Sequence, residues 1–189
     1  MLFHRPLSLR LTPSHMSTES AMPRAALLLL AACMLLSPRL AAQTVWEQMK
    51  DFKGGIVTAL EPHPDGRIYA GTLGSGIFVS TDEGKNWTPK NTGLAARDVH
   101  DILIATDQAL YVGTSEAVYK STNGGDSWFH SSNGLTQPGV NALIQTRNGA
   151  ILAGTEGRGL FISTNGGANW SNQNNAMNVF RVTALAMDA

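Results

Sequence analysis

The sequence predicts an all-β protein, a β-propeller of four-stranded antiparallel blades with about three and a half blades in an incomplete ring. Three features that recur every 41 or 42 residues predict this fold. They are a tryptophan, a glycine inside an Ala/Val-Gly-Thr tripeptide, and an octapeptide that ends in tryptophan. Repeats of this length indicate propeller blades or helical solenoids. The recurring residues are Trp46, Trp87, Trp128 and Trp170, and Gly71, Gly113 and Gly154.

The local pattern inside each repeat favours blades over helices. Each unit has four short runs of strand-like composition, separated by turn residues such as Pro64, Asp65 and Gly66. Turns this closely spaced leave no room for a helix of about ten residues. Strands are expected at 57–61, 68–72, 77–80 and 86–89 in the first unit, and at 140–145, 151–155, 160–163 and 169–172 in the third. The predicted blades cover about 55–91, 98–132 and 139–174, and the next blade starts at 181–189.

The octapeptide explains the turn after each third strand. It reads STDEGKNW at 80–87, STNGGDSW at 121–128 and STNGGANW at 163–170. Serine and Asp or Asn side chains hydrogen-bond within tight turns, glycine supplies a positive φ, and tryptophan covers the hairpin. The motif resembles that of the Asp-box propeller family, and the resemblance covers residues 45–189. It implies a structural role for Ser80, Asp82, Gly84, Trp87, Ser121, Asn123, Gly125, Trp128, Ser163, Asn165, Gly167 and Trp170.

The two ends of the repeat region predict a ring that does not close. Residues 45–48 around Trp46 match an outer strand without its three inner partners, and residues 181–186 match an inner strand. The closing blade then lacks its two middle strands. Because an unpaired strand is an aggregation hazard, we expect either a truncated product or fragment of a larger protein, or self-association of chains to complete the ring.

The N-terminal 42 residues are predicted to be a signal peptide with an upstream extension. Twelve apolar residues at 25–36 follow Arg24 and precede a small-residue cleavage site after Ala42. Because a membrane-spanning helix takes about 20 apolar residues, no stable membrane span is expected. The predicted location is therefore secreted, periplasmic or on the cell surface. An alternative is a lipoprotein modified at Cys33, the only cysteine.

Charge and residue spacing argue against several kinds of partner and cofactor. Residues 43–189 carry 10 Lys and Arg against 13 Asp and Glu, so no basic surface for nucleic acid is expected. His63, His100 and His130 share neither a blade position nor the spacing of metal ligands, so no metal site is predicted. No cofactor and no catalytic residue is predicted either.

Sequence differences between the blades mark a candidate ligand face. In a meander blade the second turn and the link to the next blade share one end of the sheet, opposite the octapeptide. These segments vary between repeats while the strands do not. The candidate ligand residues at this end are Arg97, Glu116, Glu156, Arg158, Phe180 and Arg181.

The predicted function is non-enzymatic binding or scaffolding with a protein or carbohydrate ligand. Asp-box propellers include sortilin-type receptors, a photosystem assembly factor family, sialidases and xyloglucan-degrading glycosidases, and the phrase VTAL…DGRIYAGT…GIF also resembles sensory propellers of hybrid two-component regulators. The alternative that the resemblance implies is a sialidase-like glycoside hydrolase fragment. A glycosidase needs two carboxylates across a cleft, and the spacing of Glu116 and Glu156 does not establish such a pair.

Overall fold

A computed structural model describes residues 55–136, 139–175 and 180–188. All described residues belong to one compact unit, Glu47–Ala189. The predicted signal peptide, its alternative lipidation site at Cys33 and the strand around Trp46 lie outside the described residues. Among the described residues there are strands and turns but no helix.

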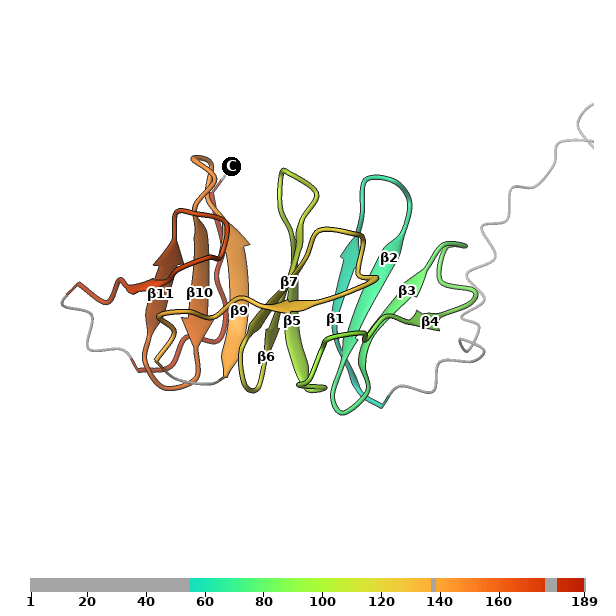
Figure 1. The fold of residues 1–189 in the computed structure, drawn as a ribbon, viewed down its shortest axis with the longest axis horizontal. Coiled ribbons are helices and arrows are strands. Elements are labelled where there is room, and N and C mark those ends of the chain that lie inside the picture. The colour runs from blue at the N-terminus through green and yellow to red at the C-terminus, as the bar shows by residue number, and fades with distance from the viewer. Residues whose placement is uncertain (1–54, 137–138, 176–179, 189) are drawn as a thin grey trace, which may run out of the picture. The chain divides into compact units, whose positions relative to one another are not determined.

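Within the described residues, twelve strands form three four-stranded antiparallel sheets, which confirms the all-β fold class with four-stranded blades. Within each sheet the strands are neighbours in chain order, and the labels of β1 to β4 follow this order in Figure 1. Blade 1 holds β1 (Val57–Pro62), β2 (Ile68–Thr72), β3 (Gly76–Ser80) and β4 (Thr88–Pro89). Blade 2 holds β5 (Val99–Ile104), β6 (Leu110–Thr114), β7 (Val118–Ser121) and β8 (Phe129–His130). Blade 3 holds β9 (Val140–Gln145), β10 (Ile151–Thr155), β11 (Leu160–Ser163) and β12 (Ser171–Asn172).

The hydrophobic core lies between neighbouring blades. One buried cluster joins Tyr69 and Ile77 of blade 1 to Val99 and Trp128 of blade 2, and a second cluster joins blade 2 to blade 3 in the same way. The first strand of each following blade packs against the preceding blade, β5 against β1 and β2, and β9 against β5 and β6. Removal of these apolar side chains from water is the main force that holds the blades together.

This packing explains the Ala/Val-Gly-Thr repeat. A Cβ atom added at Gly71 or Gly113 would lie 2.7 Å or 2.9 Å from the side chain of the next blade's valine, Val99 or Val140. At Gly154 it would lie 2.6 Å from Val182. The glycine is therefore required because the next blade's first strand approaches closely there.

The first strand predicted at 181–186 is not a strand in the structure, although its start is held beside blade 3. The Val182 N–H donates to Thr155 O at 2.9 Å, and the Gly159 N–H donates to Phe180 O at 2.8 Å. Residues 180–188 have no ladder with any described strand, since no second strand lies beside them there. The prediction that the next blade starts at 181–189 stays a prediction, since a ladder requires a second strand beside this segment.

Candidate functional site

The three octapeptide turns, residues 80–87, 121–128 and 163–170, share one hydrogen-bond pattern. In the first turn the Ser80 hydroxyl donates to Asp82 Oδ1 at 2.8 Å and accepts from the Gly84 N–H at 2.8 Å. The Asn86 N–H donates to the same carboxylate oxygen at 2.8 Å. The second turn repeats these contacts through Ser121 and Asn123, and the third through Ser163 and Asn165. Because Asn86 occupies the turn, β4 starts later than predicted, at Thr88.

The third residue of the octapeptide is charged only in the first turn, where it is Asp82. The backbone N–H of Asn86, then the Asn86 side chain and the Ser80 hydroxyl, lower the pKa of Asp82 to about 2. Hydrogen bonds to the ionised form cause this shift. Asn123 and Asn165 accept the same backbone bonds without a charge.

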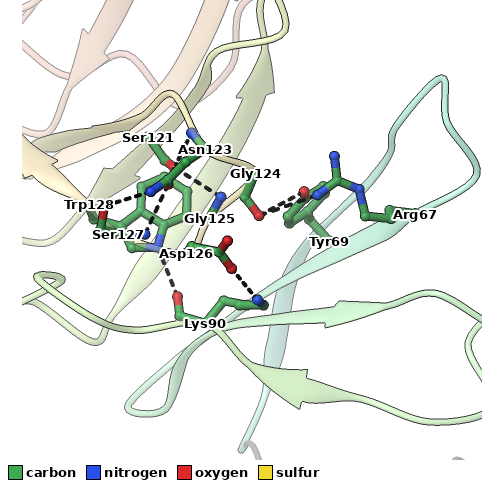
Figure 2. A network of polar contacts seen from close by, with 10 residues as sticks. All are labelled: Arg67, Tyr69, Lys90, Ser121, Asn123, Gly124, Gly125, Asp126, Ser127 and Trp128. Atoms are coloured by element: carbon green, nitrogen blue, oxygen red, sulfur yellow. Dashed lines mark hydrogen bonds and ion pairs between the residues drawn. The ribbon is translucent and has the colours of Figure 1, made fainter.

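The second octapeptide turn also docks on the preceding blade, and Figure 2 shows this network. The Trp128 indole N–H donates to Lys90 O at 2.8 Å, and the Tyr69 hydroxyl donates to Gly124 O at 3.1 Å. The Arg67 guanidinium lies 5.6 Å from the centre of the Tyr69 ring, and Lys90 forms an ion pair with Asp126. The turn therefore joins two blades in addition to closing its own hairpin.

The third octapeptide turn docks on blade 2 with corresponding contacts. The Trp170 indole N–H donates to Ser131 O at 2.7 Å, and the Tyr111 hydroxyl donates to Gly166 O at 2.9 Å. The Lys120 ammonium donates to the same carbonyl at 3.0 Å and lies 5.1 Å from the centre of the Tyr111 ring. Sequence reasoning missed the role of the two tyrosines. Their equivalent position in the second strand, two residues before the repeated glycine, is a signal that could have revealed it.

The second turns and the interblade links lie at one end of the blades, as predicted. The Ser115 N–H donates to Asp98 O at 3.0 Å, and the Glu156 N–H donates to Gly139 O at 2.9 Å. The Gly76 N–H donates to Arg97 O at 3.0 Å, which ties the link to the preceding blade's second turn. The six candidate ligand residues Arg97, Glu116, Glu156, Arg158, Phe180 and Arg181 are all exposed, and 71% of the Phe180 surface is accessible.

The structure brings two of these six residues into direct contact. Arg181 Nε lies 3.0 Å from Glu156 Oε2, and the Asn141 amide donates to the same oxygen at 2.9 Å and to Val182 O at 3.1 Å. The side chains of Arg97, Glu116 and Arg158 form no ion pair or hydrogen bond with any described residue. This end of the blades therefore carries one exposed ion pair and three exposed side chains without a polar partner among the described residues.

Asn141 belongs to a set of polar residues that sequence reasoning missed. Thr58, His100 and Asn141 occupy the same first-strand position in the three blades. Each makes a polar contact with the carbonyl oxygen of the next blade's valine. Because three different residue types contact this carbonyl, a search for identical residues between the repeats does not find the shared contact.

Two inner-strand carboxyl groups have perturbed acidities. Burial raises the pKa of Asp101, although the backbone N–H groups of Leu143 and Ile102 stabilise its ionised form. The Leu143 N–H lies 2.6 Å from Asp101 Oδ2, so this carboxylate bridges β5 to β9. Burial, followed by the charge of Asp101, raises the pKa of Glu61. Because backbone groups occupy both Asp101 oxygens, we interpret it as an interblade bridge instead of a catalytic acid.

Surface hollows lie at the opposite end, beside the first turns. One is lined by His63, Asp65, Arg67 and Asn123, and another by Arg147 and Met187 among other residues. In the first hollow, His63 Nδ1 lies 2.7 Å from Asp65 Oδ1, and Arg67 pairs with the second carboxylate oxygen. The hydrogen bond from Arg67 holds the pKa of Asp65 well below its usual range. The charges of Asp65 and Arg67 compensate each other, and His63 completes an internally paired cluster.

Within residues 55–136, 139–175 and 180–188, no three His, Cys, Asp or Glu residues gather as they would around a metal ion. Over the same ranges, no helix has the length and apolar character needed to cross a bilayer.

Repeated four-stranded sheets, glycine-mediated contacts between blades and turns docked on the preceding blade define a β-propeller domain. The chain belongs to the DUF6242 beta propeller domain family, whose sequence model matches residues 63–183. No curated protein matches the chain.

Solved structures share the fold. The extracellular domain of a proposed one component system from B. thetaiotaomicron has a TM-score of 0.55 and 20% identity, over 67% of this chain and 18% of its own. An ancestral GH74 enzyme has a TM-score of 0.55 and 24% identity, over 69% of this chain and 19% of its own. YCF48 from Cyanidioschyzon merolae has a TM-score of 0.55 and 18% identity, over 67% of this chain and 39% of its own. The chain thus spans less than two thirds of each of these structures.

Proposed function

We propose that this chain is an exported Asp-box propeller that binds a protein or carbohydrate ligand through the candidate ligand face, without catalysing a reaction. The single observation that carries the proposal is the contrast between the two ends of the blades. At one end the octapeptide turns repeat the same contacts from blade to blade. At the other end the exposed side chains differ in every blade, so binding specificity would reside there.

The neighbours support a binding role by likeness of fold. One is an extracellular domain of a proposed one component system, and YCF48 has been solved bound to D1 peptide. On the candidate ligand face, exposed Phe180 offers an apolar contact, while Arg97 and Arg158 offer cationic donors. Aromatic and arginine side chains are the types most often responsible for binding energy at protein interfaces. These residues favour a protein ligand with an acidic or carbonyl-rich segment over an apolar small molecule.

Screening of the exported protein on a peptide array and a glycan array tests this function. The variants Arg97→Ala and Phe180→Ala should each weaken binding to the selected ligand by about tenfold, a typical loss for an interface anchor. Lys85→Ala is the matched control, because Lys85 is exposed on an octapeptide turn at the other end of the blades. Equal loss in all three variants, or hydrolysis of a fluorogenic sialoside, would contradict the proposal.

Export is proposed from the N-terminal segment and requires a separate measurement. N-terminal sequencing of the product should show a new terminus at Gln43. A lipid-modified terminus at Cys33 would establish the alternative, and an intact Met1 in the cell would contradict export.

A further inference from the structure

A hollow between blades 1 and 2 lies at the end of the blades opposite the candidate ligand face. Its walls come from the first turns of these two blades and from the second octapeptide turn, and we call it the first-turn hollow. Its volume of about 430 Å³ lies within the range of about 300–1,000 Å³ that is typical of small-molecule sites. Both blades around it are described in full, since the described residues run without a gap from 55 to 136.

His63 departs from the repeat at the first-turn hollow. Ala105 and Thr146 hold its position in blades 2 and 3, since each of the three residues donates its backbone N–H to a carbonyl four residues later. In blade 3 the Thr146 hydroxyl donates to Asn148 Oδ1. In blade 1 His63 Nδ1 makes the corresponding contact with Asp65 Oδ1 at 2.7 Å. A threonine is therefore enough for the turn, and the second nitrogen of the imidazole, Nε2, is not needed for it.

The His63 Nε2 atom is left to accept a hydrogen bond from a ligand. A distance of 2.7 Å from Nδ1 to a carboxylate oxygen requires a proton between them, and this contact outweighs the Asp65 N–H at 3.3 Å from the same nitrogen. In the neutral ring Nε2 is then an acceptor. The side chain is only 5% exposed, and no described residue forms a hydrogen bond with Nε2. Because no fully buried side-chain nitrogen or oxygen of the described residues lacks a partner, Nε2 must reach solvent, and the first-turn hollow is the one that His63 lines.

Gln108 departs from the repeat on the other wall of the same hollow. Gly66 and Gly149 hold its position in blades 1 and 3, since each of the three donates its N–H to the carbonyl at the start of its turn. All three have positive φ, 67° at Gln108 against 91° and 84° at the glycines. Glycine adopts this conformation without the strain that a side chain brings. The Gln108 side chain is exposed and forms no hydrogen bond with any described residue, so the strain serves no visible structural contact and indicates a functional one.

The chemistry of the lining favours a neutral ligand that is rich in hydroxyl groups. Asp65 and Arg67 pair with each other, so neither charge is left to attract an ionic ligand. The described residues that line the hollow include no aliphatic or aromatic hydrophobic side chain, which disfavours an apolar ligand. The exposed Gln108 amide and Thr122 hydroxyl can each donate and accept hydrogen bonds, as sugar hydroxyls do.

We infer that the first-turn hollow binds a neutral mono- or disaccharide, one hydroxyl group of which donates to His63 Nε2 while others bond to Gln108 and Thr122. Asp65 positions the imidazole through Nδ1, and the Tyr69 ring, whose centre lies 6.0 Å away, packs against it from the side. The site is independent of the proposed function, because the candidate ligand face lies at the other end of the blades.

Saturation-transfer difference NMR of the protein with glucose, galactose, mannose, N-acetylglucosamine, maltose, cellobiose and lactose tests this site. We expect at least one sugar to bind, and His63→Thr to weaken its affinity by about tenfold, the usual effect of one lost hydrogen bond. The melting temperature should stay unchanged, because threonine keeps the turn contact as Thr146 does. His130→Thr is the matched control, since His130 is exposed on β8 and does not line the hollow.

Gln108→Gly separates binding from folding. Glycine should not lower the melting temperature, because it relieves the left-handed strain, but loss of the amide should weaken sugar affinity by about tenfold. A lower melting temperature with unchanged affinity would give Gln108 a structural role and overturn the inference. It would also be overturned if none of the seven sugars binds, if His63→Thr and His130→Thr lose affinity equally, or if Arg97→Ala on the candidate ligand face loses as much as His63→Thr.

Discussion

Blades 1 and 2 meet through the same backbone contacts as blades 2 and 3, but some of the side chains at the two junctions differ. In each, a tyrosine hydroxyl donates to a glycine carbonyl of the next octapeptide turn, and the turn's tryptophan indole donates to the carbonyl of the residue directly after the preceding blade's outer strand. The cation over the tyrosine differs in origin. It is Arg67 from the first turn at one junction and Lys120 from the third strand at the other.

This difference shows which part of the junction is fixed. The backbone of the turn is the constant acceptor, whereas the cationic donor comes from the first turn at one junction and from the third strand at the other. Each junction also contains a hydrogen bond between main-chain groups. The backbone N–H of Trp128 donates to Thr92 O at 2.9 Å, and the backbone N–H of Trp170 donates to Asn133 O at 2.8 Å. Side chains on the donor side can therefore be exchanged more freely than the glycines that allow the backbones to approach.

Alanine at the link glycines should give the largest effect on these junctions. Gly93 and Gly134 have positive φ, and an added Cβ would lie 2.3 Å and 2.2 Å from the carbonyl oxygens of Trp128 and Trp170. We expect each alanine variant to lower the free energy of unfolding by about 3 kcal/mol, from left-handed strain and overpacking together. Gly149→Ala is the control, because its φ is positive but nothing lies within 4 Å, and it should cost about 1 kcal/mol. Urea denaturation measures both, and equal losses would contradict the close approach.

Removal of the tyrosine hydroxyls should give a smaller and symmetric effect. Tyr69→Phe and Tyr111→Phe each remove one hydrogen bond to a turn carbonyl and should cost about 1 kcal/mol of unfolding free energy. Tyr119→Phe is the matched control, since Tyr119 is buried and its ring packs on His130 without a hydroxyl hydrogen bond among the described residues. A loss in Tyr119→Phe as large as in the other two would show that the effect reflects packing of the ring and not the junction.

The smallest expected effect is the pH dependence that Asp82 gives to the first octapeptide turn. Because its pKa in the folded protein is about 2, below the usual value near 4, the stability it contributes is present above about pH 4 and is lost as the pH falls towards 2. Asp82→Asn should flatten the melting temperature between pH 4 and 2 relative to the wild type. Asn165→Asp should introduce the same dependence in the third turn, where the acceptor geometry is equivalent. Parallel curves for all three proteins would refute this origin.

Much of the fold could be predicted because the same pattern of strand and turn residues occurs three times in the sequence. The period, the turn residues and the alternating apolar runs specified four strands per unit, and the structure has them with small differences at the strand ends. The interblade contacts were harder to predict. Different residue types contact the same kind of backbone carbonyl: Arg67 and Lys120 at the octapeptide turns, and Thr58, His100 and Asn141 at the next blade's valine. Their equivalence is visible only when the neighbouring carbonyl is known.

The sequence by itself determined the local structure of this protein. Serine, Asp or Asn, glycine and tryptophan at fixed positions form the octapeptide turns through contacts within a few residues. Only the tertiary structure decided what the repeated glycines and tyrosines contact and how Glu156 meets Arg181. These contacts join residues about one repeat apart in the sequence, and their geometry depends on the packing of whole blades against each other.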